Sequence, residues 1–417
     1  MKIAVWHNLP SGGGKRALYQ QVEGLIGRGH EVESWCPATA NQEYLPLASL
    51  CREHILPLDF KRESRWRFPF AWSSKMEQRI EAMDSHCRAC ADQINARGFD
   101  ILFATSCKFY RVTSIARHVR IPSVIYLHEP YRLLYEALPR LPWAALPAVS
   151  ALRRFQPSRL KAALQDQLSI RSLRIQVREE RDNAAAFDRI LVNSLFSRES
   201  ILRAYGLNSY VCYLGVDCRL FSPTDEPVEN YVIGLGALDI AKGADRAVRA
   251  IGRIPKNIRP RLVWIGNFSD PAYESDLRIL AESHGVTLDV RVMVSDAELR
   301  SALSRARAMI YTPRLEPFGL APLEANACGV PVVGIAEGGV RESIHHGING
   351  FLVDSDDPKA LAEALTAILS DAQRSNQLRL SSLDHVRKNW TMPKAIDRLE
   401  ESLEATNREF GTGDAQR

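Results

Sequence analysis

Two glutamates, Glu316 and Glu324, stand in residues 312–333, the stretch of the chain that is richest in side chains able to do chemistry. An apolar run ends at Tyr311, and a helical pattern begins near residues 318–320. The free N–H groups of such a helix start would point to the mouth of the sheet, where open α/β sheets bind ligands. If the span were helical throughout, the two Cα atoms would be ~12 Å apart. A hydrolase acid–base pair holds its carboxyl groups about 5 to 9.5 Å apart.

This spacing therefore indicates that Glu316 and Glu324 bind different parts of one extended ligand and do not act as a paired acid and base. A ribose, a phosphate and a second sugar in one molecule would fit it. The alternative interpretation is structural, with Glu324 solvated on its helix or capping a neighbouring helix.

A second candidate site is the glycine-rich segment NLPSGGGKRAL at residues 8–18, which follows a short apolar run. It is no P-loop, because Leu9 stands at the first glycine position and Arg16 at the Ser/Thr position. It also lacks the dinucleotide fingerprint, since Ala17 replaces the third glycine. What remains is a strand-to-helix turn whose backbone N–H groups suit an anion, or a tight turn that needs only positive φ.

The eight cysteines are scattered, and the close pair is Cys87 and Cys90, preceded by His86. A zinc site needs further ligands at matching spacing, and a redox pair needs a thioredoxin-like context. We find neither in the sequence and expect partly buried thiols on a helix. No metal ligand is predicted anywhere in the chain.

The elements that must position these residues form two series of apolar strands with helical patterns between them, as parallel sheets require. The first series has expected strands at residues 3–6, 31–35, 101–104, 123–126 and 189–192, and the second at 231–235, 262–265, 288–292, 308–311, 330–334 and 350–353. We therefore expect an α/β protein of two doubly wound, Rossmann-like parallel-sheet domains facing across a cleft.

The expected domain boundary lies in the turn-rich stretch at residues 221–230. The N-terminal domain would span residues 1–222, with a basic helical insertion at about 131–180, and the C-terminal domain residues 223–388. We expect residues 389–410 to form a helix that packs back on the N-terminal domain, and residues 411–417 to be a disordered tail.

Charge is distributed unevenly along the chain. Residues 1–220 hold 31 Lys plus Arg against 21 Asp plus Glu, a net charge of +10, and the remainder holds 23 against 28, a net charge of −5. Residues 60–72 interleave arginines with aromatic side chains. An anionic lipid headgroup or a diphosphate-linked glycan would suit this half, and a solvated basic face with ordinary core aromatics is the alternative. Nucleic acid is not expected, since the excess is mostly arginine in helical context and none of the familiar nucleic-acid modules is present.

No apolar run is long enough to span a membrane, and the best one, residues 142–152, carries two prolines. The first residues enter a strand without a basic region followed by a long apolar one, so we expect no secretory signal. The predicted location is cytoplasmic, with peripheral attachment to the inner face of the cytoplasmic membrane as an extension of that prediction.

The stretch around Glu316 and Glu324 resembles the signature of the retaining glycosyltransferases of family 4, which carry Glu, seven residues and Glu in this context. Six further segments resemble that family in its order: HEPYRLLYE, ILVNSLFSRESILRAYG, YLGVDCRLFSP, GLGALDIAKGADRAVRAI, VSDAELRSAL and GGVRESIHHGINGFLV. The resemblance covers nearly the whole chain and implies the two-domain GT-B fold.

The resemblance also implies a donor site for a nucleoside-diphosphate sugar. Glu324 would bind the ribose hydroxyls, and Glu316 would hold hydroxyls of the transferred sugar and the charge at its anomeric carbon. Lys242 would pair with the diphosphate, unless it is an exposed lysine at a helix start. The remaining donor contacts would be the backbone at Phe318, Gly319 and Leu320, and the turn at Gly13 and Gly14 beside the leaving diphosphate.

His128 would be the second catalytic residue with Glu316, contacting a hydroxyl of the donor sugar across the cleft, and a satisfied core histidine is the alternative. Lys15 would turn to the diphosphate or to solvent. Ala237 departs from the family, which often has arginine there.

The implied reaction moves a hexosyl unit from GDP-mannose or a UDP-hexose to a glycan or lipid-linked acceptor in polysaccharide, lipopolysaccharide or glycolipid assembly. It would retain the anomeric configuration and use neither metal nor cofactor. A sensor that binds the sugar nucleotide without turnover is the alternative from another functional class.

Overall fold

The computed structural model describes residues 1–60, 75–136 and 157–411, and the chain divides into two compact units. The first comprises Met1–Val192, Arg198–Val211 and Leu399–Arg417, and the second comprises Asn193–Ser197 and Cys212–Arg398. All but Phe60 of the aromatic and arginine-rich segment at residues 60–72, and all but Gly411 of the expected tail, lie outside the described residues.

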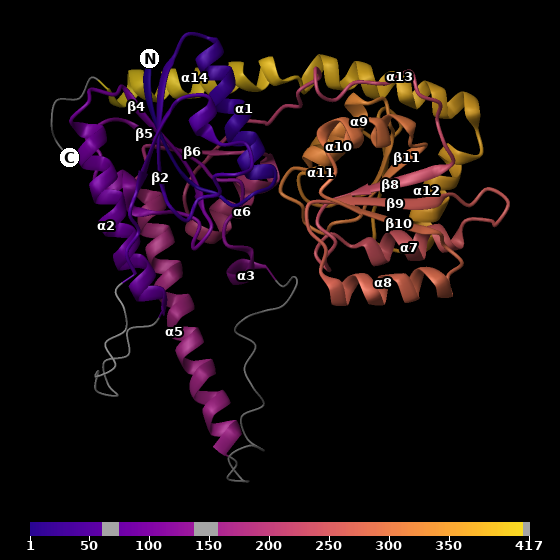
Figure 1. Ribbon diagram of the computed structural model, residues 1–417, viewed down its shortest axis with the longest axis horizontal. Coiled ribbons are helices and arrows are strands. Elements are labelled where there is room, and N and C mark those ends of the chain that lie inside the picture. The colour runs from indigo at the N-terminus through magenta and orange to yellow at the C-terminus, as the bar shows by residue number, and fades with distance from the viewer. Residues whose placement is uncertain (61–74, 137–156, 412–417) are drawn as a thin grey trace. The chain divides into compact units, whose positions relative to one another are not determined.

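The first unit is built on a seven-stranded parallel sheet in the order β3-β2-β1-β4-β5-β6-β7 (Figure 1). Its strands are β1 (Lys2–Asn8), β2 (Glu31–Pro37), β3 (Arg52–Leu56), β4 (Ile101–Cys107), β5 (Ser123–Tyr126), β6 (Arg189–Val192) and β7 (Tyr210–Val211). The five predicted strands are confirmed. β3 and β7 were not predicted, because β3 carries Arg52, Glu53 and His54 in five residues and β7 has only two residues.

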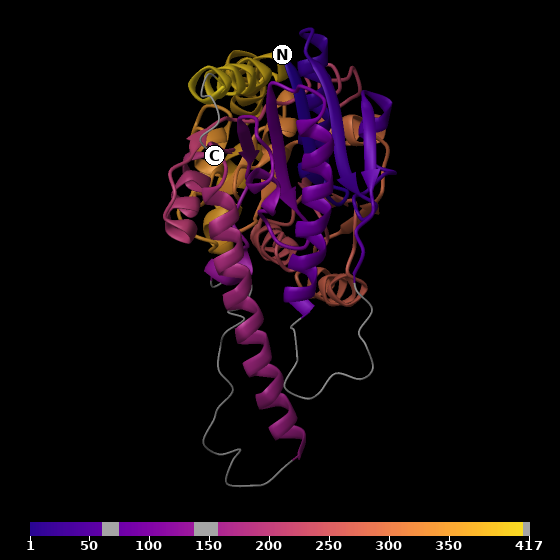
Figure 2. The same cartoon turned by 90° about the vertical axis from the view of Figure 1, so that its left-hand side faces the viewer.

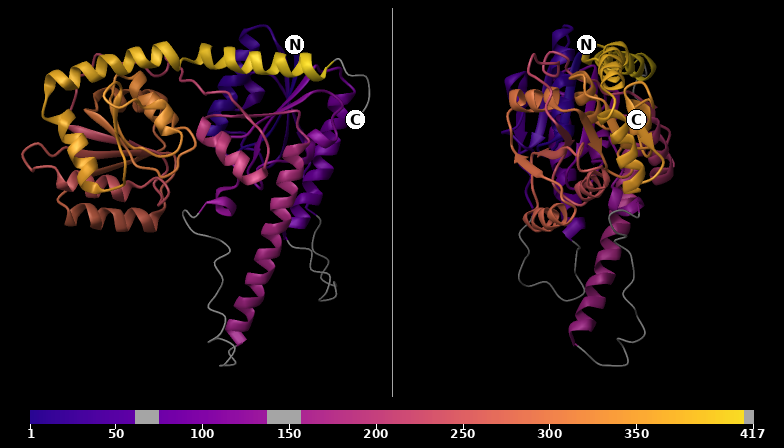
Figure 3. Two further views of the ribbon diagram at one scale, coloured as in Figure 1. Left: turned by 180° about the vertical axis from the view of Figure 1, so that it is seen from behind. Right: turned by 90° about the vertical axis from the view of Figure 1, so that its right-hand side faces the viewer.

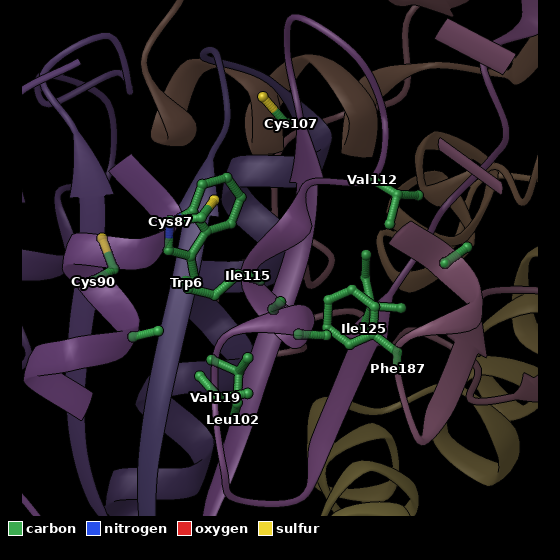
Figure 4. Packing of buried hydrophobic residues seen from close by; sticks show 14 of the residues in the cluster. Trp6, Cys87, Cys90, Leu102, Cys107, Val112, Ile115, Val119, Ile125 and Phe187 are labelled. Carbon is green, nitrogen blue, oxygen red and sulfur yellow. The ribbon is translucent and has the colours of Figure 1, made fainter. Parts of the chain in front are cut away.

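The helices that begin in this part of the chain are α1 (Gly13–Gly27), α2 (Lys75–Asn95), α3 (Arg132–Tyr135), α5 (Pro157–Ala185) and α6 (Leu195–Tyr205), with 3-10 turns η1 (Leu47–Ser49) and η2 (Ser114–Arg117). α5 runs beside α2 and continues well past the sheet of its own unit (Figure 2). The core packs Trp6 and Leu102 of the sheet against apolar side chains of α2 and η2 (Figure 4).

The second unit has a six-stranded parallel sheet in the order β10-β9-β8-β11-β12-β13, with helices on both of its faces (Figure 3). The strands are β8 (Tyr231–Leu235), β9 (Arg261–Gly266), β10 (Leu288–Val292), β11 (Ala308–Tyr311), β12 (Val332–Ile335) and β13 (Gly350–Val353). All six predicted strands are confirmed, with small shifts at their ends.

The helices of the second part of the chain are α7 (Ala244–Arg253), α8 (Pro271–Ser283), α9 (Asp296–Arg305), α10 (Leu320–Ala327), α11 (Val340–Ser343), α12 (Pro358–Leu369), α13 (Ala372–Asn389) and α14 (Met392–Phe410). From Leu399 onward α14 belongs to the first unit, where Glu400 bonds Arg28 and His30. In the ranges that the structure describes, no helix has the length and apolar character needed to cross a membrane.

Candidate active site

The predicted donor residues of the second unit gather where its strand order reverses, between β8 and β11. Open α/β sheets bind ligands at such a switch point, outside the carboxyl ends of the strands. The segment after β8 leads to Lys242 and Gly243, and the segment after β11 runs from Thr312 to Gly319. The two segments are joined directly, because Thr312 Oγ1 donates to the Gly243 carbonyl oxygen at 2.8 Å.

Two helices start at this switch point, and each starts from a glycine in the left-handed region. Gly243 precedes α7 with φ 71°, and Gly319 precedes α10 with φ 92°. The N-cap glycines provide no side-chain cap, but the Tyr273 hydroxyl accepts a bond from Asp245 N in the first turn of α7 at 3.2 Å. The N–H groups of Leu320 and Ala321 at the start of α10 therefore suit an anion, which the helix dipole also favours.

Lys242 and Glu316 form an ion pair across 74 positions of sequence. Lys242 Nζ lies 3.0 Å from Glu316 Oε2 and 3.3 Å from Glu316 Oε1. The two side chains are 29% and 17% exposed, so the pair lies at the protein surface without being fully solvated. Both residues were predicted from sequence, but their direct contact was not.

The loop that carries Glu316 is held in a strained shape. Leu315 has φ 51°, a conformation that a non-glycine residue adopts at a cost. The Glu316 carbonyl oxygen accepts a bond from Gly339 N at 2.8 Å. A Cβ built onto Gly338 would lie 2.3 Å from that same oxygen, and one on Gly339 would lie 2.1 Å from the Pro317 carbonyl oxygen. Only glycines allow these two backbone segments to approach so closely.

Arg314 stabilises the same loop through bonds to two carboxylates. Its guanidinium bonds both carboxylate oxygens of Glu337 at 2.6 Å and Asp356 Oδ2 at 2.7 Å. These partners hold the pKa of Arg314 above its ordinary value, with the Glu337 hydrogen bonds as the main cause. Arg246 of α7 also reaches Asp356, at 3.4 Å. Two arginines thus lie around the Lys242–Glu316 pair, and sequence reasoning missed both.

The other predicted donor residues are on α10 and the residues before it. Phe318 is buried and packs its ring near those of Tyr213 and Trp390. Glu324 is half-buried within α10. Because α10 begins at Leu320, Glu316 lies outside the helix, so the separation calculated for a continuous helix does not apply to this pair.

In the first unit, the glycine-rich turn follows β1 and leads into α1, beside the switch point between β1 and β4. Gly12 has φ 135°, but Gly13 and Gly14 are not among the residues with positive φ. A Cβ on Gly13 would meet nothing within 4 Å, and one on Gly14 would be 3.8 Å from His128 Nε2. A positive φ therefore explains the glycine at position 12 only, and open space that a ligand could occupy lies over Gly13.

His128 lies two residues after the end of β5 and is half-buried, with its ring 4.9 Å from that of Tyr126. Burial and then the nearby charge of Arg111 lower its pKa to about 4, so the imidazole is neutral at pH 7. Arg111 donates to Glu129, the residue after His128, at 2.8 Å. Sequence reasoning predicted His128 and missed Arg111.

Lys15 turns to neither the loop nor the solvent. Its side chain is fully buried next to His7, Glu53 and Cys36. The prediction that Lys15 turns to solvent was wrong, because α1 directs this side chain toward the sheet. The backbone of Gly13 and Gly14, not the lysine, is what the turn leaves open.

Cys87 and Cys90 lie on α2 among apolar side chains (Figure 4). Both are fully buried, and burial raises the pKa of each thiol well above its ordinary range. These thiols are more deeply buried than expected and are inert members of the core.

Similar solved structures define the class of fold. Sucrose-phosphate synthase from Thermosynechococcus elongatus covers 99% of this chain and 100% of its own, with a TM-score of 0.70 at 18% identity. HepE from Anabaena, in complex with UDP, covers 97% and 100% with a TM-score of 0.69 at 16% identity. With its two parallel-sheet α/β units, the chain has the GT-B fold of glycosyltransferases.

Family models identify the chain more narrowly. The model for Glycosyltransferase Family 4 matches residues 11–220, and the model for Glycosyl transferases group 1 matches residues 221–382. The chain therefore belongs to the group 1, family 4 glycosyltransferases.

Curated relatives include D-inositol 3-phosphate glycosyltransferase 1 of Catenulispora acidiphila, which is 31% identical over 247 residues. That match covers 54% of this chain and 59% of the relative. The D-inositol 3-phosphate glycosyltransferase of Xylanimonas cellulosilytica is 32% identical over 253 residues, or 55% and 60% of the two chains. The chain thus matches about three-fifths of the length of these relatives.

Proposed function

We propose that this protein transfers a hexosyl unit, with retention of anomeric configuration, from a nucleoside-diphosphate sugar to a glycan or lipid-linked acceptor. The observation that carries the proposal is the Lys242–Glu316 ion pair beside two helix starts, each of which begins from a glycine in the left-handed region. A cation and a carboxylate side by side match a ligand that joins a diphosphate to a sugar. Donor binding places the diphosphate on Lys242 and the sugar hydroxyls on Glu316.

The leaving diphosphate needs positive charge, and the second unit offers more than Lys242. The Arg246 guanidinium lies against the same turn, since a Cβ on Gly243 would be 2.4 Å from its Nη1. Arg246 is thus a candidate for the positive partner that Ala237 does not provide. The N–H groups at the start of α10, after Phe318 and Gly319, add donors fixed in direction.

The ribose of the donor is assigned to Glu324 on α10, at the end of the ligand away from Glu316. The solved HepE structures hold UDP and UDP-glucose, which favours a UDP-hexose as the first donor to test. GDP-mannose is the second.

The acceptor is assigned to the first unit, at the carboxyl ends of β4 and β5. Thr105 Oγ1, Ser106 Oγ and Arg111 Nε are buried there and have no hydrogen-bond partner among the described residues. Buried polar atoms of this kind are costly unless a ligand or water bonds them. They suit the hydroxyls of a sugar acceptor.

A phosphorylated polyol is a second candidate acceptor. The names of the curated relatives specify D-inositol 3-phosphate, and the Arg111 guanidinium next to His128 would complement a phosphate. Parallel assays with D-inositol 3-phosphate and with lipid-linked glycans distinguish the two acceptor classes.

In the proposed reaction, the bond between the anomeric carbon and the phosphate oxygen breaks, and its electron pair leaves with the diphosphate. The acceptor oxygen bonds the anomeric carbon on the same face, and its proton passes to a leaving-phosphate oxygen. Glu316 stabilises the positive charge at the sugar, while Lys242 stabilises the negative charge on the phosphate. Neutral His128 contacts a sugar hydroxyl without adding a competing positive charge. No metal is required by this scheme.

A lipid-linked acceptor would place the protein at a membrane surface. The exposed side chains of Arg171, Arg174 and Arg178 follow one another at helical spacing along α5. We assign this stripe to contact with anionic lipid, a peripheral attachment at the cytoplasmic membrane. Sedimentation with vesicles of phosphatidylglycerol should exceed that with phosphatidylcholine, and equal binding would remove the assignment.

The donor is identified by thermal-shift measurements with UDP-glucose, UDP-galactose, UDP-N-acetylglucosamine, GDP-mannose and the bare diphosphates, because a ligand that binds the folded state raises the melting temperature. The donor that binds is then incubated with both acceptor classes. Donor consumption that depends on the acceptor supports the enzyme. Binding without consumption would favour the sensor, and absence of binding by every sugar nucleotide would contradict the proposed function.

A further inference from the structure

A second group of chemically competent side chains lies in the first unit, on the face of the sheet that α1 covers. His7 is on β1, Cys36 on β2 and Glu53 on β3, which are three neighbouring strands of the sheet. Lys15 reaches the same place from the first turn of α1. The proposed glycosyl transfer gives none of these four side chains a role.

The three strand residues converge on one point. His7 Nε2 lies 2.9 Å from Glu53 Oε1, and Cys36 Sγ lies 3.7 Å from that oxygen. Within the described ranges these are the one set of three or more His, Cys, Asp or Glu residues whose ligand atoms all lie within 4.8 Å of one another. The His7 and Glu53 side chains are 0% and 1% exposed, so the group is shielded from water.

Several polar atoms of the cluster have no hydrogen-bond partner among the described residues. They are His7 Nδ1, Glu53 Oε2 and Lys15 Nζ, and each is buried. Leaving a buried polar atom unpaired destabilises the folded protein, and a charged group does so more strongly. His7 Nδ1 and Glu53 Oε2 can each accept a bond from a further species, whereas the Lys15 ammonium is a donor and cannot ligate a cation.

We propose that His7, Cys36 and Glu53 form a binding site for a divalent transition-metal ion of the zinc type. An imidazole nitrogen, a thiolate sulfur and a carboxylate oxygen are the ligands that zinc prefers. On binding, the Cys36 S–H bond breaks, its proton passes to solvent, and the sulfur electron pair forms the bond to the metal. The ligands come from three paired strands, so the sheet holds them close together before the ion arrives.

The positive charge of Lys15 opposes metal binding at this site. Its ammonium lies in the same cluster, where it is attracted to Glu53. A metal ion and Lys15 therefore compete for the carboxylate, and each repels the other. This competition distinguishes the site from one built only to hold metal, and it predicts that removal of the lysine charge tightens metal binding.

Metal analysis of the full chain without an affinity tag tests the site directly. After incubation with zinc sulfate and exhaustive dialysis, about one zinc per chain should remain. Cobalt chloride should produce a thiolate-to-cobalt charge-transfer band, which reports a sulfur ligand. Both signals should be lost in Cys36→Ser and kept in Cys218→Ser, which removes a partly exposed thiol of the second unit.

The competition is tested with Lys15→Met. Zinc affinity should rise by roughly tenfold or more, the direction expected when a like charge is removed nearby. Circular dichroism checks that this variant folds, and the wild-type cobalt spectrum remains decisive if it does not. Absence of retained zinc, a cobalt spectrum without the sulfur band, or unchanged binding in Cys36→Ser would each overturn the proposal. Donor binding in the second unit is measured separately, so failure here is distinguishable from failure of the proposed function.

Discussion

The two units share one architecture but prepare their switch points differently. In the second unit, the segments after β8 and β11 carry an accessible ion pair, Lys242 with Glu316. In the first unit, the lysine after the glycine-rich turn is fully buried, and the turn itself is open at Gly13. At its switch point the second unit therefore carries accessible charge, whereas the first carries backbone N–H groups and a neutral imidazole.

The glycines of the two units also differ in how closely other atoms pack against them. Gly338 and Gly339 are pressed against the backbone that carries Glu316, so a side chain there would displace it. Gly14 has only ordinary contacts to the position of an added Cβ. We infer that the backbone of the second unit's site is already in its binding conformation. We infer also that the glycines of the first unit leave space for a ligand. The predictions below separate these two kinds of site.

Glu316→Gln should have the largest effect. Loss of the carboxylate charge removes stabilisation of the sugar in the transition state, and kcat/KM should fall by about 10²–10³-fold. Initial rates of transfer at saturating acceptor measure it. Glu363→Gln, on the exposed side of α12, is the matched control and should retain wild-type rates. Wild-type turnover in Glu316→Gln would remove the catalytic assignment of the second unit.

His128→Ala should reduce kcat by roughly 10- to 100-fold while changing donor affinity much less. The reason is that the proposed function assigns donor affinity mainly to the second unit and assigns His128 a contact with the transferred sugar. Turnover and the equilibrium Kd of the donor are measured on the same preparation, with His346→Ala, an exposed histidine, as control. Equal losses in both quantities would contradict this division of roles.

Glu324→Ala should weaken donor binding by about tenfold, since it removes a charge-assisted hydrogen bond to the ribose. Isothermal titration with the donor and with its nucleoside diphosphate should show the same loss, because both contain the ribose. A loss seen only with the complete sugar nucleotide would move Glu324 from the ribose to the sugar.

Gly14→Ala should weaken donor binding by a few-fold without lowering the melting temperature, because its added methyl meets only contacts of 3.8 Å in the protein. Gly27→Ala, at the other end of α1, meets nothing within 4 Å and should leave donor binding unchanged. If Gly14→Ala destabilises the protein as much as it weakens binding, the turn is structural.

The smallest effect concerns pH and stability. His128 has a pKa of about 4 in the folded protein, below the ordinary histidine value of 6.5. The unfolded chain therefore binds more protons between these values, so this histidine's contribution to stability is complete above pH 6.5 and is lost as the pH falls towards 4. Urea unfolding of wild type and His128→Gln across this window should show the stronger loss in wild type. Parallel pH profiles would contradict the lowered pKa.

The sequence predicted the strands that are rich in apolar residues, because local periodicity records which face of an element is buried. It did not predict β3, whose Glu53 is polar yet has a side chain only 1% exposed. That glutamate is accommodated because His7 and Cys36, distant in sequence, donate to it. Burial of a charged residue depends on such partners, and no local pattern reports them.

By itself, the sequence determined the two alternating series of strands and helices, the glycine-rich turn and the candidate residues at strand ends. Only the tertiary structure decided which of them meet: Lys242 with Glu316 across 74 positions, Gly14 beside His128, and Lys15 with its buried neighbours. The physical reason is that secondary structure follows from neighbours along the chain, whereas ion pairing and burial follow from neighbours in space.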